Sequence, residues 1–227
     1  MNRKNFVESD PLIFKKRCRW AAFFLFNRIF IKMNLLAHIH LSGNSEEIMI
    51  GNFIGDFIKG KNFEPYSNGF KTGILLHRHI DFFTDTHEVV SASKSILYPR
   101  YHKYAGVMVD IFYDHFLARN WEKYHPEPLE KFAADFYASI SRWEKILPLQ
   151  VRQFLPYMVK NNWLVNYRKL EGIQRSLSGM SRRAKFISGM ENGVEDMKLH
   201  YDEFNAHFNS FYPELLASVQ KELSKTD

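Results

Sequence analysis

Apolar residues recur along most of the chain at intervals of three or four, which is the spacing of one buried face of an α-helix. No long stretch alternates apolar and polar residues as a half-buried β-strand requires. We therefore expect an all-α fold in a single helical domain. The pattern predicts helices over residues 45–59, 67–87, 105–121, 129–146, 151–169 and 192–223.

Residues that begin or end helices fall at the borders of these segments. Ser45 and Ser67 are of a type that accepts hydrogen bonds from the first free N–H groups of a helix. Gly60 follows the first segment, as a glycine often follows a helix. Proline lacks the N–H that a helix interior needs, so breaks are predicted at Pro99 and Pro213.

The composition is typical of one globular domain with an aromatic-rich core. The chain has 227 residues, of which 45% are hydrophobic and 16% aromatic, enough for one sizeable core. Its one cysteine, Cys18, cannot form a disulfide within the chain, so we expect a reducing, cytoplasmic location. The formal charge of +6 favours an anionic partner, namely nucleic acid, membrane headgroups or an acidic protein.

Residues 1–32 differ from the rest and are expected to form an N-terminal extension ahead of a domain at 33–227. Basic residues at 15–19 precede a broken apolar run, which is shorter than the about 20 residues of a membrane-spanning helix. We therefore expect no transmembrane segment, and the extension lacks the cleavage site of a secreted protein. The extension is either a peripheral membrane contact through residues 13–31 or a segment before the true start at Met33.

Three of the predicted helical segments carry acidic, amide or imidazole side chains four residues apart, on one helix face. Each face is otherwise apolar and should point to the core, where a carboxylate is costly unless it is paired or binds a metal. The pairs are Asn52 with Asp56, His77 with Asp81, and Asp110 with Asp114, which His115 follows directly. Their convergence would give a site of oxygen and imidazole ligands, suited to Mn²⁺, Mg²⁺ or Fe and less specifically to Zn²⁺.

Ordinary structural roles are open for each pair taken alone. A His–Asp pair four residues apart is commonly an ion pair on a helix, and Asn52 with Asp56 is compatible with a buried polar network. Acidic residues on three helices nearly in succession favour the metal site. One of His38 and His40 could join it, although either suits a hydrogen-bonded position in the core equally well.

A succession of short motifs runs from Met33 almost to the C-terminus, and their order is more specific than any one of them. The motifs are Met33–His38, Gly51–Phe57 with Lys59–Gly60, Gly73–Asp81 with Thr84–Asp85, Asp110, Asp114–Leu117, Trp163–Val165 with Tyr167, and Gly179–Arg183. In these residues the chain resembles the acyl carrier protein phosphodiesterase family, which is distantly similar to HD-type metal phosphohydrolases. The resemblance implies an HD-like helical bundle.

The resemblance also implies an activity, the hydrolysis of the phosphodiester of holo acyl carrier protein, with Mn²⁺ as cofactor. The products are 4′-phosphopantetheine and apo carrier protein. HD-type enzymes carry adjacent His and Asp, whereas this chain has Asp114 followed by His115, so its ligands are assigned from the helical faces. We expect His77, Asp81, Asp114 and His115 to bind metal, Asp56 and Asp110 to be further ligands or to orient water as a base, and Arg78 to contact the phosphate.

An acidic carrier protein implies a basic docking face on this chain. Six cations close together in the sequence are expected to serve it: Arg168, Lys169, Arg175, Arg182, Arg183 and Lys185. Two other functions stay open, namely an HD-like phosphohydrolase for a nucleotide or another small phosphodiester, and a basic helical module without activity. No known nucleic-acid-binding motif is visible, so nucleic acid is not expected as a partner.

Overall fold

The computed structural model describes residues 34–61, 63–64 and 66–225, and within these ranges it contains helices and no strand. This confirms the predicted all-α class. The N-terminal extension (1–32), with Cys18 and the predicted membrane contact, lies outside the described residues. Among the helices that the structure describes, none combines the length and the apolar character needed to cross a membrane.

The α-helices follow one another with mostly short connections. In chain order they are α2 (Leu35–His40), α3 (Glu46–Phe53), α4 (Asn68–Thr86), α5 (Glu88–Tyr101), α6 (Ala105–Arg119), α7 (Leu129–Arg142), α8 (Leu149–Lys160), α9 (Trp163–Asn166), α10 (Leu170–Arg183), α11 (Gly193–Leu199) and α12 (Tyr201–Leu223). Single 3₁₀ turns lie between several of them, and η2 (Gly55–Phe57) contributes to the site described below.

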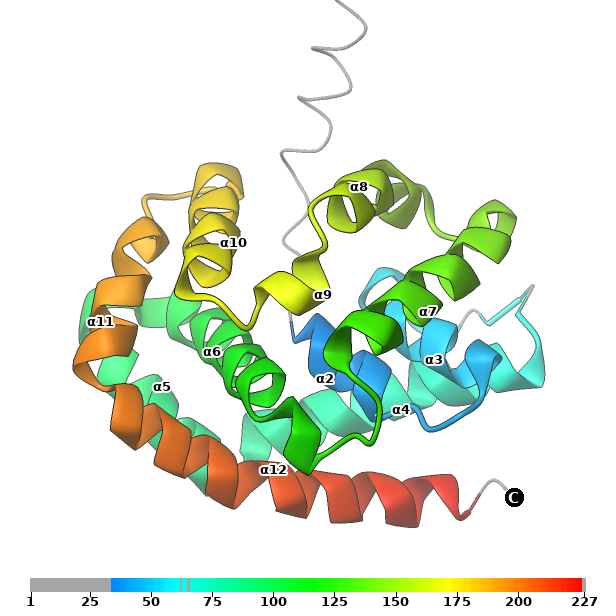
Figure 1. Cartoon of the computed structure of the whole chain (residues 1–227), viewed down its shortest axis with the longest axis horizontal. Helices are drawn as coiled ribbons and strands as arrows, with labels where there is room; N and C mark the ends of the chain where they lie inside the picture. The colour runs from blue at the N-terminus through cyan, green and yellow to red at the C-terminus, as the bar shows by residue number, and fades with distance from the viewer. Residues whose placement is uncertain (1–33, 62, 65, 226–227) are drawn as a thin grey trace, which may run out of the picture.

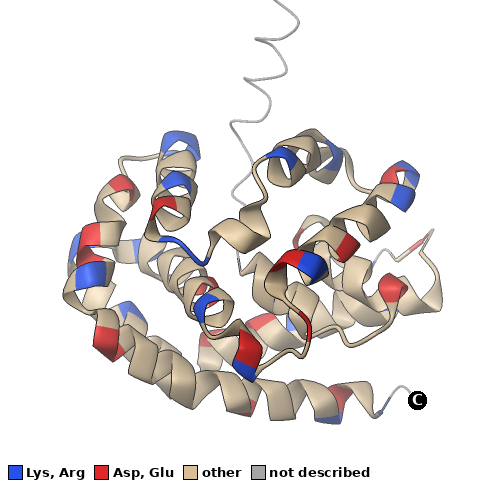
Figure 2. Cartoon of the chain, viewed as in Figure 1, with Lys and Arg blue, Asp and Glu red and all other residues tan. Residues whose placement is uncertain are grey.

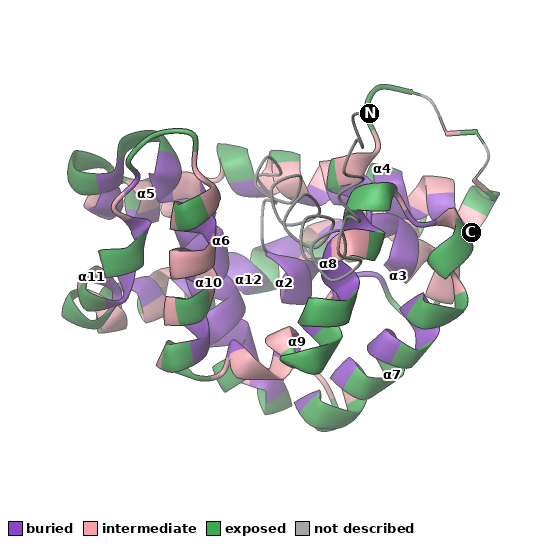
Figure 3. Ribbon diagram, turned by 90° about the horizontal axis from the view of Figure 1, so that it is seen from above, coloured by how far each residue is buried: buried purple, intermediate pink, exposed green. Residues whose placement is uncertain are grey.

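Helix α6 is the most deeply buried long helix, and almost all of its residues from Val107 to Ala118 are covered by neighbouring elements (Figure 3). The long helix α12 runs along one side of the molecule, opposite α8 and α10, and packs against α4, α5 and α6 (Figure 1). The short helix α2 packs against both α3 and α6, and α3 packs along α4. This packing brings α2, α3 and α4 together beside the central helix.

Two glycines allow α3 and α4 to approach closely. A Cβ atom on Gly51 would lie 2.4 Å from the backbone oxygen of Phe70, and one on Gly73 would lie 2.2 Å from that of Ile48. Because the side chains at a crossing set the distance between helix axes, any larger residue here would push the two helices apart. The close crossing places Asn52 next to His77, which the site requires.

The predicted breaks at Pro99 and Pro213 are wrong, since α5 and α12 run through these residues. A proline inside a helix costs about 3 kcal/mol. Burial of one large side chain contributes about 1.5–3 kcal/mol, and Leu97 and Tyr101 flank Pro99 with 1% of their surface exposed. Packing on both sides of the proline therefore offsets its cost, which the local sequence does not reveal.

The predicted helix at 45–59 is correct in its first half and wrong in its second. Ser45 caps α3 by accepting a hydrogen bond from the N–H of Ile48, as predicted. The helix ends at Phe53, however, and the chain turns into η2. Asp56 therefore does not share a helix with Asn52, although both reach the same site.

Candidate metal centre

Four side chains from three elements meet beside the α3–α4 crossing. His38 lies on α2, His77 and Asp81 lie on α4, and Asp56 lies on η2. The Nε2 atom of His38 is 3.4 Å from Oδ1 of Asp81, and Nε2 of His77 is 3.6 Å from Oδ2 of Asp81. Nε2 of His77 is also 3.3 Å from Oδ1 of Asp56. The two imidazole rings stack on each other with their centroids 4.2 Å apart.

Asn52, fully buried on α3, fixes both histidine rings through their other nitrogen. Nδ1 of His38 donates to the side-chain oxygen of Asn52 at 2.7 Å, and Nδ1 of His77 donates to its backbone oxygen at 2.9 Å. The amide nitrogen of Asn52 donates to the backbone oxygen of His38 and to Oγ of Ser42, which sets the orientation of the amide. A neutral imidazole that donates through Nδ1 carries its lone pair on Nε2. Both histidines therefore present a lone pair on the side of the carboxylates.

This arrangement fits a divalent cation. Nε2 of His38 and Nε2 of His77 are buried and have no hydrogen-bond partner among the described residues, which is costly for a polar atom. Their separations of 3.3–3.6 Å from the carboxylate oxygens exceed ordinary hydrogen-bond lengths. They match the spacing of neighbouring ligands around a cation that lies about 2.0–2.2 Å from each. Ligand atoms of His38, His77 and Asp81 all lie within 4.8 Å of one another.

The electrostatics favour the protonation states that bind a metal. Burial lowers the pKa of His38, the nearby His77 acts in the same direction, and Asp81 opposes them only in part. The neutral imidazole is thus favoured, and a histidine must be neutral to bind a cation. The side chains of Asp81 and Asp56 are 22% and 26% exposed, whereas those of His38 and His77 are 2% and 7% exposed. The imidazoles therefore form the floor of the site and the carboxylates form its rim.

The η2 turn is held against α4 by steric fit at its first residue. A Cβ atom on Gly55 would lie 2.3 Å from Cγ of His77, so no larger residue fits there without displacing the ring. This close contact keeps Asp56, the next residue, beside His77.

Arg78 holds the segment that follows η2. Its guanidinium donates to the backbone oxygens of Ile58 at 3.0 Å and Gly60 at 2.6 Å and lies over the ring of Phe63. These hydrogen bonds differ from the phosphate contact that we expected of Arg78. In the structure Arg78 ties the chain around Asp56 to α4.

Asp114 lies outside the group of possible ligands and instead caps helix α2. It is fully buried on α6, and its two oxygens accept hydrogen bonds from the N–H groups of Leu36 and Ala37, each at 3.0 Å. Burial raises the pKa of Asp114 well above its usual value, and the two N–H groups oppose that rise. The carboxylate satisfies free donors at the start of the helix that carries His38. In the structure Asp114 therefore supports helix α2 instead of lying with the possible ligands, where we expected it.

His115 and Asp110 also lie away from the four converging side chains. Nδ1 of His115 donates to the backbone oxygen of Tyr167 at 2.8 Å, and its Nε2 accepts from the hydroxyl of Tyr201 at 2.9 Å. Both ring nitrogens are occupied, so His115 cannot be the metal ligand that we expected without losing these bonds. Asp110 is 7% exposed and lines a cavity of about 10 Å³ with Thr84.

The structure decides between the two histidines that the sequence left open. His40 bonds to the hydroxyl of Tyr212 and the backbone oxygen of Tyr124, within an aromatic group that includes Trp121. His38 joins the site and was missing from the expected ligands. The sequence signals for it were its His-Ile-His context and its place at the end of the motif Met33–His38. The two histidines lie on different faces of α2.

The six cations of the expected docking face do not behave alike. Arg168 is engaged, because it donates to Glu130 at 2.7 Å and to the backbone oxygen of Ala118. Lys169 precedes α10 and is exposed, and Lys185 lies over the ring of Phe186. The other three line one pocket: Arg175, Arg182 and Arg183.

Comparisons with known proteins agree with the resemblance read from the motifs. A family model described as acyl carrier protein phosphodiesterase matches residues 33–215. Two proteins named acyl carrier protein phosphodiesterase, from Photorhabdus laumondii and from an Enterobacter species, are each 32% identical to this chain. Each match covers 83% of this chain, and it covers 96% of the first protein and 98% of the second. The same name is carried by a protein of Escherichia coli that is 32% identical over 193 residues, 98% of its length. No solved structure matches the chain.

Proposed function

Since the chain belongs to the acyl carrier protein phosphodiesterase family, we propose that it hydrolyses the phosphodiester joining 4′-phosphopantetheine to a serine of holo acyl carrier protein. The products are 4′-phosphopantetheine and apo carrier protein, and the reaction takes place in the cytoplasm. The observation that carries this proposal is the pair of buried Nε2 atoms without hydrogen-bond partners, on His38 and His77, beside two carboxylates.

The residues that would hold a divalent cation are His38, His77, Asp81 and Asp56. Mixed imidazole and carboxylate ligands suit Mn²⁺, which is the ion we propose, and also Mg²⁺ or Fe. When bound, such a cation offsets the negative charge of the phosphodiester and acidifies water. The shared helical faces led us to expect Asp114 and His115 as ligands, and the contacts of both side chains speak against that assignment.

The chain's own residues prepare the site for this chemistry. Asn52 holds both imidazoles in the tautomer that exposes Nε2, and Asp114 holds the helix that carries His38. Asp56 and Asp81 lie at the rim, where a phosphodiester would arrive from solvent. Of the two, Asp56 approaches only His77 in the group, and it is the better placed to accept a proton from water.

The carrier protein is proposed to dock on the positive charge of α10 and the chain around it. Arg168 is paired with Glu130, so we assign this role to the other five cations of the expected set. Attraction between an acidic partner and this surface should steer the encounter and weaken as salt rises. The Michaelis constant for holo carrier protein should therefore increase steeply between low and moderate salt, while the turnover number stays nearly constant.

The proposal is tested by incubating the protein with holo acyl carrier protein and Mn²⁺ and measuring the intact mass of the carrier. Loss of the 4′-phosphopantetheine arm is the expected result, and it should stop when a chelator is added. Linear and cyclic nucleotides serve as parallel substrates. Turnover of nucleotides without turnover of holo carrier protein would instead favour an HD-like phosphohydrolase of small phosphodiesters.

A further inference from the structure

One cavity in the described part of the chain lies away from the metal centre. It has a volume of about 470 Å³ and lies between the end of α8, α9 and α10. None of His38, Asp56, His77 and Asp81 lines it. Small-molecule sites in proteins typically span about 300–1,000 Å³, so the pocket has the size for a ligand of its own.

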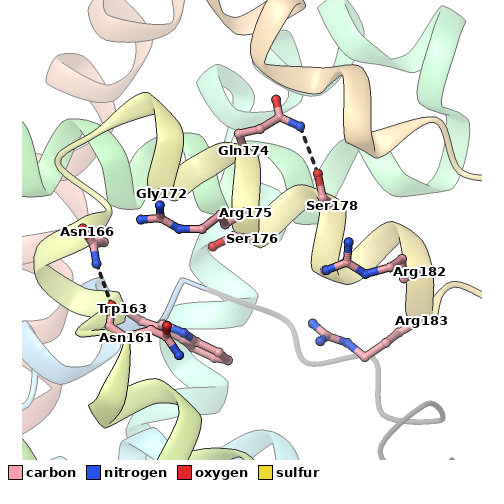
Figure 4. A pocket seen from close by; sticks show the side chains of 11 residues that line it. Asn161, Trp163, Asn166, Gly172, Gln174, Arg175, Ser176, Ser178, Arg182 and Arg183 are labelled. Atoms are coloured by element: carbon pink, nitrogen blue, oxygen red, sulfur yellow. Dashed lines mark hydrogen bonds between the residues drawn. The ribbon is translucent and has the colours of Figure 1, made fainter.

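The lining of this pocket is strongly positive. Arg175, Arg182 and Arg183 on α10 surround it together with Trp163 on α9 (Figure 4). Among the described residues that line it, none is an aspartate or a glutamate. The rest of the wall consists of amides, hydroxyls and glycines: Asn161, Asn166, Gly172, Gln174, Ser176, Ser178 and Gly179.

Arg175 and Arg182 differ from several other cations of the chain. Lys131, Arg142 and Arg168 each form an ion pair with a carboxylate. Among the residues that the structure describes, neither Arg175 nor Arg182 has such a partner, and Figure 2 shows the Lys and Arg positions of α10 in blue. Like charges that line one pocket repel one another, and a bound anion reduces that repulsion.

Arg183, the third arginine of the pocket, is partly buried. Burial lowers the pKa of Arg183, and the charge of neighbouring Arg182 acts in the same direction. A guanidinium that has lost water gains more from an anionic ligand than one that is fully hydrated. Its planar set of donors matches the oxygens of a phosphate group.

We propose that this pocket is a binding site for a small phosphate ester, separate from the metal centre. The arginines bind the phosphate, and the indole of Trp163 supplies an apolar wall for the organic part of the ester. The hydroxyl and amide groups of Ser178 and Asn161 complete the polar lining. A carboxylate ligand is less well matched, because three guanidinium groups offer more charge than one carboxylate neutralises.

The experiment titrates protein freed of metal by a chelator with 4′-phosphopantetheine and, separately, with adenosine monophosphate. Binding is followed by calorimetry, with inorganic phosphate as a competitor. Saturable binding of either ester, displaced by phosphate, is the expected result, and the ester that binds more tightly identifies the source of the ligand. Failure of both esters to bind overturns the proposal.

Two variants separate this pocket from general surface charge. The double variant R175Q/R182Q should weaken binding of the ester at least tenfold, whereas K185Q, which removes a cation outside the pocket, should leave it unchanged. Equal weakening in both would show a diffuse charge effect and would overturn the site. The pocket would be part of the docking face if the parent protein bound no ester and R175Q/R182Q raised the Michaelis constant for carrier protein. That pair of results would overturn the proposal.

A third variant fills the pocket and keeps its charge. A Cβ atom on Gly179 would meet only the guanidinium of Arg183, at 3.7 Å, so G179L should fold and occupy the space by its side chain. We expect it to lose ester binding, and unchanged ester binding would overturn the proposal. D81N should bind the ester normally while losing turnover of holo carrier protein. Turnover thus tests the proposed function, and ester binding tests this proposal separately.

Discussion

Two groups of buried histidine and aspartate residues lie on neighbouring elements of this protein and differ in how they are satisfied. On α2 and α4, His38 and His77 keep one ring nitrogen without a hydrogen-bond partner in the described structure. On α6, His115 and Asp114 have hydrogen-bond partners for both ring nitrogens and both carboxylate oxygens. The two groups share their residue types, so residue type alone does not tell a site from a structural network. They differ in the hydrogen bonds of the imidazoles and in the exposure of the carboxylates, since Asp81 is 22% exposed and Asp114 is fully buried.

The largest expected effect comes from removing a carboxylate of the first group. D81A should reduce turnover of holo carrier protein about a thousandfold, since a metal ion contributes several kcal/mol to transition-state stabilisation. Helical content and the midpoint of thermal unfolding should stay near those of the parent. The measurements are intact mass of the carrier, metal content and circular dichroism.

The matched control for this variant is D85A, one turn further along α4, where the carboxylate pairs with Lys94 at the surface. It should keep full activity and metal content. Equal loss of turnover in the two variants would contradict the assignment of Asp81.

Removing a carboxylate of the second group should have the opposite profile. D114A leaves two buried N–H groups at the start of α2 without an acceptor. Each unsatisfied donor costs about 1–3 kcal/mol, so we expect a loss of about 2–4 kcal/mol in the free energy of unfolding. Denaturant unfolding measures it. A variant as stable as the parent that has lost only its metal would place Asp114 among the ligands and break the comparison.

Asn52 shares a feature with each group. Its side-chain oxygen and nitrogen are both hydrogen-bonded, as in the second group, and it positions the histidines of the first group. N52A removes the acceptor that fixes His38 and should weaken Mn²⁺ binding about 10- to 100-fold. Calorimetric titration with Mn²⁺ gives the affinity. S42A removes a hydroxyl that accepts from Asn52 and donates to the backbone oxygen of His38, but it leaves the bonds of both imidazoles in place and should change the affinity far less.

The smallest expected effect is a pH dependence of stability from His115. Burial lowers the pKa of His115 from 6.5 to about 4 in the folded protein. Between these values the unfolded chain binds the proton more readily, so stability falls as pH decreases from about 6.5 to about 4.

In H115Q the loss of unfolding free energy over this pH range should be smaller by about 1–3 kcal/mol. H102N is the control, since His102 is exposed and its positive φ of 47° suits asparagine. An unchanged slope in H115Q would show that His115 does not set the pH dependence.

Much of the fold follows from periodicity, and the exceptions have local causes. The spacing of apolar residues predicts α4 and α6 closely. Ser45 and Ser67 mark where α3 and α4 begin, although only Ser45 accepts a capping hydrogen bond. The continuation of α12 through Pro213 depends on burial of Tyr212 and Leu215 on both sides, which is a property of the packed molecule. This burial cannot be deduced from the apolar spacing within a single segment of the sequence.

The candidate site was accessible from the sequence only in part. The pair His77 and Asp81 could be found because both residues lie on one helix. His38 could not be chosen over His40, since the choice depends on which face of α2 meets Asn52. Asp114 has the same helical signature as a ligand, and only its hydrogen bonds to α2 reveal a different role.

The cap that Asp114 provides has a consequence for the order of biosynthesis. Leu36 and its acceptor are 78 residues apart, and a ribosome adding about 5–20 residues per second needs about 4–16 seconds to make that length. During this interval the N–H groups at the start of the segment that carries His38 lack the acceptor that Asp114 provides. The side chains that would hold the proposed cation are therefore held in place only once α6 has emerged, after they themselves have been translated.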